Sequence, residues 1–160
     1  MRHYFRYVDD LLLLSHDPCE LLAWRDRIEV FLRSELKLEL HPKKQKLCAV
    51  QQGVDWLGYI VAPTHVLVRR RVVKRFRKTL FLLNKKLAES GQPESGQSVI
   101  PSRELLEHIL ASVNSSFGHF VYANSFRLRT CLWEKHFGRL REYIEPTDAK
   151  LRVFRIIEKV

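Results

Sequence analysis

Two adjacent aspartates, Asp9 and Asp10, separate two short apolar segments near the start of the 160-residue chain. Residues 3–8 are rich in residues that favour β-strands, and residues 11–15 form a nearly continuous run of leucines. Burying two neighbouring carboxylates is costly, so the pair is expected at an exposed position. The pattern predicts a β-hairpin with the carboxylates at its tip. A helix starting at Asp10 is the alternative, because leucine is not a strong strand former.

A helix is predicted directly after this hairpin. Asp17 can cap the helix, Pro18 suits its first turn, and Glu20 would complete a capping box. Apolar residues then recur at helical spacing, which predicts a helix that packs on a sheet. These residues are Leu21, Trp24, Ile28, Phe31, Leu32 and Leu36.

Short strands are predicted downstream of this helix. Residues 36–40 alternate leucine with charged residues, which is typical of a strand. Residues 47–61 are predicted to form two strands around a turn at 51–53, and residues 66–68 a further strand. Residues 1–68 are therefore expected to form a first domain with an antiparallel sheet and a packing helix.

From Arg69 the apolar residues follow the period of a helix. The expected buried stripe comprises Val72, Val73, Phe76, Leu80, Leu83 and Leu87. Residues 89–101 are polar, contain Gly and Pro, and are predicted to be a flexible loop. Ser102 is expected to cap the next helical segment, which a break near Gly118 separates from a last one. The predicted class is α+β, with an all-helical domain at 69–160.

The chain is strongly basic, and its cations are concentrated in one region. It has 28 Lys and Arg against 18 Asp and Glu, which gives a formal net charge of +10. A surplus of that size favours a polyanionic partner, most commonly a nucleic acid. No acidic residue occurs between Trp56 and Ala88. The cations in that interval are Arg69, Arg70, Arg71, Lys74, Arg75, Arg77, Lys78, Lys85 and Lys86.

The cysteines and the hydropathy pattern indicate an intracellular protein. Cys19, Cys48 and Cys131 are far apart and form no CxxC pair, so they are predicted to be reduced core cysteines. No apolar segment reaches the length needed to span a membrane. The expectation is a cytoplasmic protein with no membrane partner.

Four stretches resemble reverse transcriptases, and they occur in the order found in that family. The first, YVDD, starts at Tyr7 and is similar to the YxDD signature with its two metal-binding aspartates. The second, LKLELHPKKQKL, resembles the segment after the palm helix, although His41 and Gln45 replace the usual Asn and Thr. The third, GVDWLGYIV, resembles the primer-grip hairpin, with Trp56 in place of Phe. The fourth, VRRRVVKRFRKTL, resembles the start of the thumb helix, and residues 116–125 also resemble thumb sequences.

The resemblance implies RNA-directed DNA polymerase chemistry. Asp9 and Asp10 would bind Mg²⁺ or Mn²⁺, which favour carboxylate oxygens, and Lys44 would assist the departure of pyrophosphate. Nucleic-acid-binding residues would be Tyr7, Trp56, Leu57, Gly58, Tyr59, Arg69, Arg70, Arg71, Lys74, Arg75, Arg77 and Lys78. Several of these residues have a plainer interpretation. The aspartates could form a solvated turn, Tyr7 and either Trp56 or Tyr59 could be ordinary core aromatics, Lys44 could be a solvated lysine, and Gly58 could mark a bulge.

Family enzymes carry a further catalytic Asp and the fingers before the YxDD hairpin. The chain is therefore expected to be the C-terminal palm and thumb portion of such an enzyme, inactive without its N-terminal segment. The LGY tripeptide suggests the group II intron or diversity-generating type, from a bacterial or phage-type retroelement. Expected partners are an RNA template, a DNA primer and deoxynucleoside triphosphates. The alternatives are a non-catalytic RNA or primer–template binding module and a basic structural protein of unrelated fold.

Overall fold

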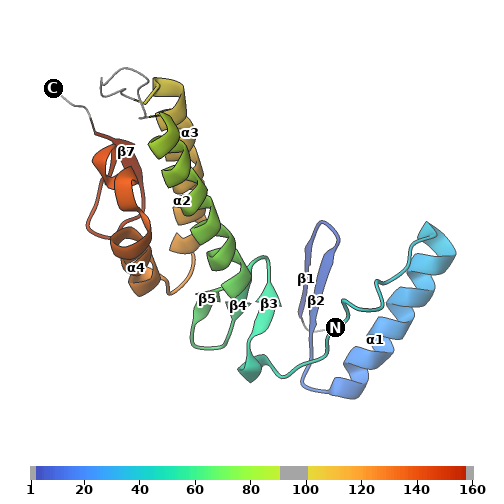
Figure 1. Cartoon of the computed structure of the whole chain (residues 1–160). Coiled ribbons are helices and arrows are strands. Elements are labelled where there is room, and N and C mark those ends of the chain that lie inside the picture. The colour runs from blue at the N-terminus through green and yellow to red at the C-terminus, as the bar shows by residue number, and fades with distance from the viewer. Residues whose placement is uncertain (1–2, 91–100, 158–160) are drawn as a thin grey trace. The chain divides into compact units, whose positions relative to one another are not determined.

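The computed structural model describes residues 3–90 and 101–157, and the chain divides into two compact units. The first unit is Met1–Ala49 and the second is Val50–Val160 (Figure 1). Helices and small antiparallel sheets occur together, which confirms the α+β class. The boundary proposed at residue 68 between a palm and a thumb remains a prediction about polymerase organisation.

The first unit begins with the predicted hairpin. Strands β1 (His3–Tyr7) and β2 (Asp10–Leu14) pair antiparallel, and Tyr7 lies opposite Asp10. The alternative of a helix starting at Asp10 is therefore wrong. The stiff aromatic side chains of β1 favour extended backbone, and pairing across the turn carries the leucines of β2 into the same ladder.

Helix α1 (Pro18–Phe31) starts where the sequence predicts. The Asp17 carboxylate accepts a hydrogen bond from the Cys19 amide at 2.8 Å. The predicted capping box is not formed, because the Glu20 carboxylate accepts from the Ser15 hydroxyl. The same Ser15 oxygen accepts from the Asp17 amide at 3.1 Å, so Ser15 occupies the place expected for Glu20.

The strand predicted at 36–40 is absent. Helix α1 continues directly into a π-helical turn, η1 (Leu32–Leu36), and Lys37 then adopts a left-handed conformation with φ 56°. The Leu38 amide donates to the Leu32 carbonyl at 2.9 Å. The backbone at 37–38 therefore closes the end of a helix and is not free to pair in a ladder.

None of the described residues of the first unit is buried. Large apolar side chains on both of its elements are exposed, among them Tyr4 and Phe5 on β1 and Val30 and Phe31 on α1. The expectation that α1 buries an apolar face on a sheet is thus not met within this unit. Cys19 is also exposed, which corrects its assignment to a core.

The second unit opens with a three-stranded antiparallel sheet of order β3-β4-β5. Its strands are β3 (Val54–Trp56), β4 (Tyr59–Val61) and β5 (Val66–Val68). The turn predicted at 51–53 falls in a 3₁₀ turn, η2 (Val50–Gln52), and no strand precedes it at 47–50. The hairpin turn lies later, at Leu57 and Gly58, because both residues have positive φ as a two-residue turn requires.

Three helices follow the sheet: α2 (Arg70–Ser90), α3 (Arg103–Val121) and α4 (Phe126–His136). Ser102 caps α3 as predicted, with the Leu105 amide donating to its hydroxyl at 3.3 Å. The break predicted near Gly118 is wrong, since α3 continues to Val121. A helical glycine costs only about 1 kcal/mol, and burial of Phe117 and Phe120 beside it outweighs that cost.

The predicted loop at 89–101 is only partly described. Helix α2 extends through its first residues to Ser90. Residues 91–100 lie outside the described residues.

The core lies in the second unit and is rich in aromatic residues. The α2 stripe is confirmed at Phe76, Leu80, Leu83 and Leu87. It packs with residues of α3, α4 and the C-terminal segment: Ile109, Val113, Phe117, Phe120, Leu132, Phe137, Leu140, Ile144, Leu151 and Phe154. Figure 1 shows α2 and α3 side by side with α4 next to them.

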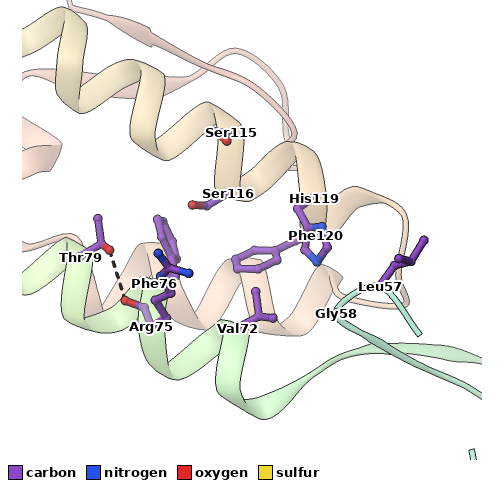
Figure 2. A pocket seen from close by; sticks show the side chains of 10 residues that line it. All are labelled: Leu57, Gly58, Val72, Arg75, Phe76, Thr79, Ser115, Ser116, His119 and Phe120. Carbon is purple, nitrogen blue, oxygen red and sulfur yellow. Dashed lines mark hydrogen bonds between the residues drawn. The ribbon is translucent and has the colours of Figure 1, made fainter. Parts of the chain in front are cut away.

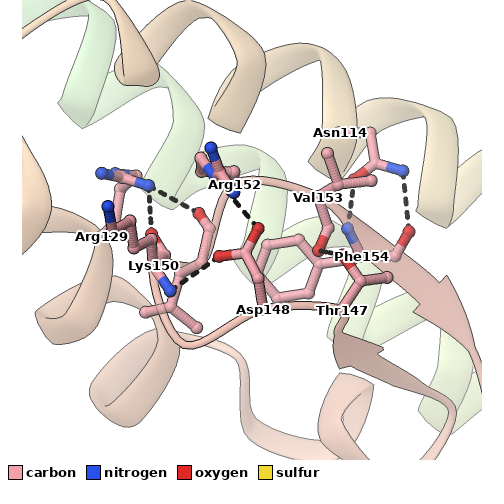
Figure 3. Close-up of polar contacts among 9 residues, drawn as sticks. Asn114, Arg129, Thr147, Asp148, Lys150, Arg152, Val153 and Phe154 are labelled. Carbon is pink, nitrogen blue, oxygen red and sulfur yellow. Dashed lines mark hydrogen bonds and ion pairs between the residues drawn. The ribbon is translucent and has the colours of Figure 1, made fainter.

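The C-terminal part corrects the expectation of an all-helical domain. A 3₁₀ segment, η3 (Gly138–Glu142), leads into strands β6 (Ile144–Pro146) and β7 (Phe154–Ile156), which pair antiparallel. The Asn114 side chain donates to the Phe154 carbonyl at 3.0 Å and accepts from its amide at 2.8 Å. This exchange ties the hairpin to α3, as Figure 3 shows.

Arg129 is a buried cation that holds the loop between β6 and β7. Its guanidinium donates to the Leu151 carbonyl at 3.0 Å and to the Lys150 carbonyl (Figure 3). It also donates to the Ser125 hydroxyl at 3.2 Å. Burial lowers the pKa of Arg129, and the charge of Asp148 opposes that shift. These three hydrogen-bond acceptors offset the free-energy cost of burying the positive charge.

All three cysteines are free, and Cys48 and Cys131 are half-buried. Within the described residues, no helix has the length and apolar character needed to cross a bilayer.

Candidate nucleic-acid and metal site

The tip of the first hairpin presents its carboxylates to solvent. The strands end at Tyr7 and Asp10, so Val8 and Asp9 form the turn. Tyr7 is 58% exposed and faces Asp10 across the ladder. Asp9 lies beyond the end of β1, so Tyr7 and Asp9 do not lie on one side of a shared strand.

Val8 holds this turn in a strained conformation. Its φ is 51°, a left-handed value that is unusual for a β-branched residue. The Arg6 guanidinium donates to the Val8 carbonyl at 2.9 Å and braces the turn. Strain of this kind costs about 1–3 kcal/mol and tends to occur at functional sites. In the turn formed by Val8 and Asp9, the strained conformation therefore falls on Val8.

Both carboxylates are available to a ligand. Neither the Asp9 carboxylate nor the Asp10 carboxylate makes a hydrogen bond or ion pair with another described residue. Paired carboxylate oxygens suit Mg²⁺ and Mn²⁺, so the donor chemistry fits a divalent cation. Within residues 3–90 and 101–157, no group of three or more metal-ligating side chains lies together, so these two are the ligands that the described chain offers at this tip.

Lys44 lies in a short turn after η1. Its amide donates to the His41 carbonyl at 3.0 Å, and its side chain is exposed. No contact between Lys44 and the carboxylates is found among the described residues. Its role at pyrophosphate remains a prediction.

In the second unit, the turn at Leu57 and Gly58 packs against α3. Tyr59 donates its hydroxyl hydrogen to the His119 carbonyl at 2.7 Å, and its ring stacks on the imidazole with centroids 4.3 Å apart. Burial raises the pKa of Tyr59, and the nearby Tyr122 hydroxyl adds to the shift. The position of Gly58 in a turn corrects its assignment to a strand. The group that approaches it is the His119 ring, at 3.1 Å from where a Cβ would be.

A pocket of about 390 Å³ opens between this turn, α2 and α3. Arg75 is the cation in its lining, and Thr79, Ser115 and Ser116 supply hydroxyl groups (Figure 2). The Thr79 hydroxyl donates to the Arg75 carbonyl at 3.2 Å, which leaves its lone pairs to accept. Sequence reasoning singled out Arg75 and Gly58, but it missed His119, whose only signal was its place in the stretch at 116–125.

The predicted basic helix is largely confirmed as an exposed surface. Arg70, Arg71, Lys74, Arg77 and Lys78 are exposed on α2. None of these five forms an ion pair with another described residue.

Arg69 differs from these cations. It precedes α2 and pairs with Asp55 at 2.8 Å, so it is already engaged. Trp56, at the end of β3, is half-buried opposite Tyr59.

The positive surface extends from α2 to α4. Burial beside the charges of Arg77 and Lys135 lowers the pKa of His136. Cations of both helices therefore lie close enough to His136 for their charges to act on it. The arrangement favours an anionic partner along this side of the second unit.

Comparison with known proteins bears on the first 61 residues. Residues 1–61 match the family model described as reverse transcriptase (RNA-dependent DNA polymerase). The matched region contains the β1–β2 hairpin, α1 and the turn at Leu57 and Gly58. A search of curated proteins finds no match.

Proposed function

We propose that this chain is the palm and thumb portion of a reverse transcriptase, which extends a DNA primer on an RNA template. The family match over residues 1–61, which includes the exposed Asp9–Asp10 tip, carries the proposal. At family level it implies nucleotidyl transfer from deoxynucleoside triphosphates. The LGY tripeptide at 57–59 supports assignment to the group II intron or diversity-generating type, in a bacterial or phage-type retroelement acting in the cytoplasm.

Each part of the chain has a role in this proposal. Asp9 and Asp10 would hold Mg²⁺ or Mn²⁺, which activates the primer hydroxyl and neutralises the leaving pyrophosphate when bound. Tyr7, exposed beside Asp10, would brace the nascent base pair. Lys44 would neutralise charge on the pyrophosphate. Trp56 and the turn after it, together with the cations of α2, would grip the primer–template.

We further propose that the first unit is completed by another polypeptide segment that carries a further carboxylate, and that the isolated chain is inactive. An isolated two-stranded hairpin is marginally stable in water at best. None of the described residues at 3–49 is buried, so the first unit has apolar surface to offer such a segment. Tyr4 and Phe5 on β1 are part of that surface.

Primer extension on an RNA template, with Mg²⁺ or Mn²⁺, tests these proposals beside an Asp9→Asn control. We expect no extension by the chain alone, together with tight and salt-sensitive binding of the same primer–template. Extension that disappears in the control would support polymerase function but overturn the need for another segment. Absence of both extension and binding would overturn the proposed function.

A second candidate is a non-catalytic module that binds RNA or primer–template through the second unit. It is favoured by one observation, that the exposed cations of α2 lie in the unit that has its own core. Metal dependence separates the two candidates. Binding through α2 needs no divalent cation, whereas catalysis at Asp9 and Asp10 requires one.

A further inference from the structure

Phe81 is an exposed aromatic residue in the middle of α2. It is 69% exposed, whereas the other helical faces bury Leu80 and Leu83 in the core. It makes no ring contact with another described residue. An aromatic side chain left in solvent at the centre of a well-packed helix has apolar area to offer a partner.

The residues around Phe81 are cations. Lys78 and Arg77 precede it by three and four residues, Lys74 by seven, and Lys85 follows it by four, so all of them share its side of the helix. Lys85 pairs with Glu89 at 3.6 Å. Lys74, Arg77 and Lys78 form no ion pair with the residues that the structure describes.

We propose that this face of α2 binds an unpaired stretch of nucleic acid, with Phe81 stacked on a base. Lys74, Arg77 and Lys78 would contact the adjoining phosphates. The charge around Phe81 complements a polyanion and opposes a basic protein partner, including a second copy of this chain. Unpaired bases expose a face for stacking on an aromatic ring, whereas a duplex keeps that face covered by its neighbours. The inference rests on the proposed function for its nucleic acid and adds that the strand held here is single.

Leu82 provides the matched control. It is the next residue of α2 and is 45% exposed, but it points toward the flank that carries Arg75 and Lys86. Removing either side chain from an exposed helical position should leave folding intact. Thermal melting of each variant checks this point.

The experiment measures fluorescence anisotropy of labelled oligo(dT), oligo(U) and a blunt RNA–DNA duplex. We expect Phe81→Ala to weaken binding of both single strands by roughly tenfold, with duplex binding changed less than about twofold. Phe81→Trp should bind single strands as the natural chain does, and Leu82→Ala should change binding by less than about twofold. The salt dependence of Phe81→Ala should match that of the natural chain, because no phosphate contact is removed.

Three outcomes would overturn the inference. The first is that Phe81→Ala binds single strands as tightly as the natural chain does. Phe81 would then not stack on a base, whereas the proposed function would stand because the natural chain still binds nucleic acid. An equal loss for single strand and duplex would show that Phe81 does not select unpaired bases. Self-association that Phe81→Ala abolishes, with binding unchanged, would identify a second copy as the partner. If the natural chain binds no nucleic acid, the proposed function fails as well.

Discussion

At the scale of single residues, two glycines of the second unit lie in opposite environments. Gly58 has φ 88°, and a Cβ there would lie 3.1 Å from His119 Nε2. That nitrogen is buried and has no hydrogen-bond partner among the described residues. Gly118 lies within α3, and a Cβ there would meet no described atom within 4 Å beyond the adjoining residues and backbone of its own helix. A substitution at Gly58 therefore tests backbone strain, whereas the same substitution at Gly118 tests the ordinary cost of a glycine in a helix.

We expect Gly58→Ala to lower the free energy of unfolding of the second unit by about 1–2 kcal/mol, because alanine is strained at positive φ. Gly118→Ala should raise that free energy by about 1 kcal/mol, since alanine favours helix and has room. Urea denaturation followed by circular dichroism measures both. A destabilised Gly118→Ala would mean that the open space beside α3 is filled in solution.

At the scale of elements, α2 is distinguished by its exposed cations. Lys74, Arg77 and Lys78 are exposed, and a basic surface that binds phosphates releases counterions when it does so. Their contribution can be isolated because three other exposed arginines of this unit are paired with acids and can serve as a control. Arg103 pairs with Glu107, Arg152 with Asp148 and Arg155 with Glu145.

We expect replacement of Lys74, Arg77 and Lys78 by glutamine to weaken binding of single-stranded nucleic acid. The slope of log affinity against log salt should fall by about 2, at about 0.7 per lost phosphate contact on a single strand. A control with glutamine at Arg103, Arg152 and Arg155 removes the same formal charge. Anisotropy titrations at several salt concentrations measure both, and an equal fall in the control would indicate a general charge effect without a binding face on α2.

Sequence analysis predicted elements well where one strong local signal decided them. The apolar stripe of α2, the cap at Ser102 and the carboxylate hairpin tip are set by residues close in sequence, and all were confirmed. The prediction of a strand at 36–40 was wrong because the backbone there hydrogen-bonds to the end of the preceding helix. The β6–β7 hairpin was missed because Asn114 and Arg129, distant in sequence, hold it in place.

The candidate site could be predicted only in part for a similar reason. Adjacent aspartates and a run of cations can be recognised in a sequence, and so can the tripeptide at the second turn. The contact between Tyr59 and His119 joins residues sixty positions apart, and no periodicity signals it. Arg69 was predicted to bind nucleic acid, but it forms an ion pair with Asp55. That pair depends on how two segments lie in space, which the composition of the sequence does not reveal.

At the scale of the whole molecule, the two units differ in what stabilises them. The buried apolar residues lie in the second unit, whereas none of the described residues at 3–49 is buried. Local stability follows buried contacts, so opening of the hydrogen bonds should differ greatly between the units.

We expect hydrogen exchange to be fast in the first unit and slow in the second. Amides of β1, β2 and α1 should exchange orders of magnitude faster than those of α2 and α3 near Leu80 and Phe117. Exchange followed by mass spectrometry on the natural chain measures the difference. Equal protection in both units would mean that the first unit acquires a packing partner in solution, such as another copy of the chain.

The buried guanidinium of Arg129 has a practical consequence for handling the protein. Mobile ions screen exposed charges strongly and enclosed ones weakly, so the carbonyls of Lys150 and Leu151 keep their donor in concentrated electrolyte. The cations on α2 are exposed, so salt screens their charges strongly. Concentrated salt would therefore elute copurifying polyanions from the chain while the loop between β6 and β7 stays in place, so that the recovered protein can be reloaded without refolding.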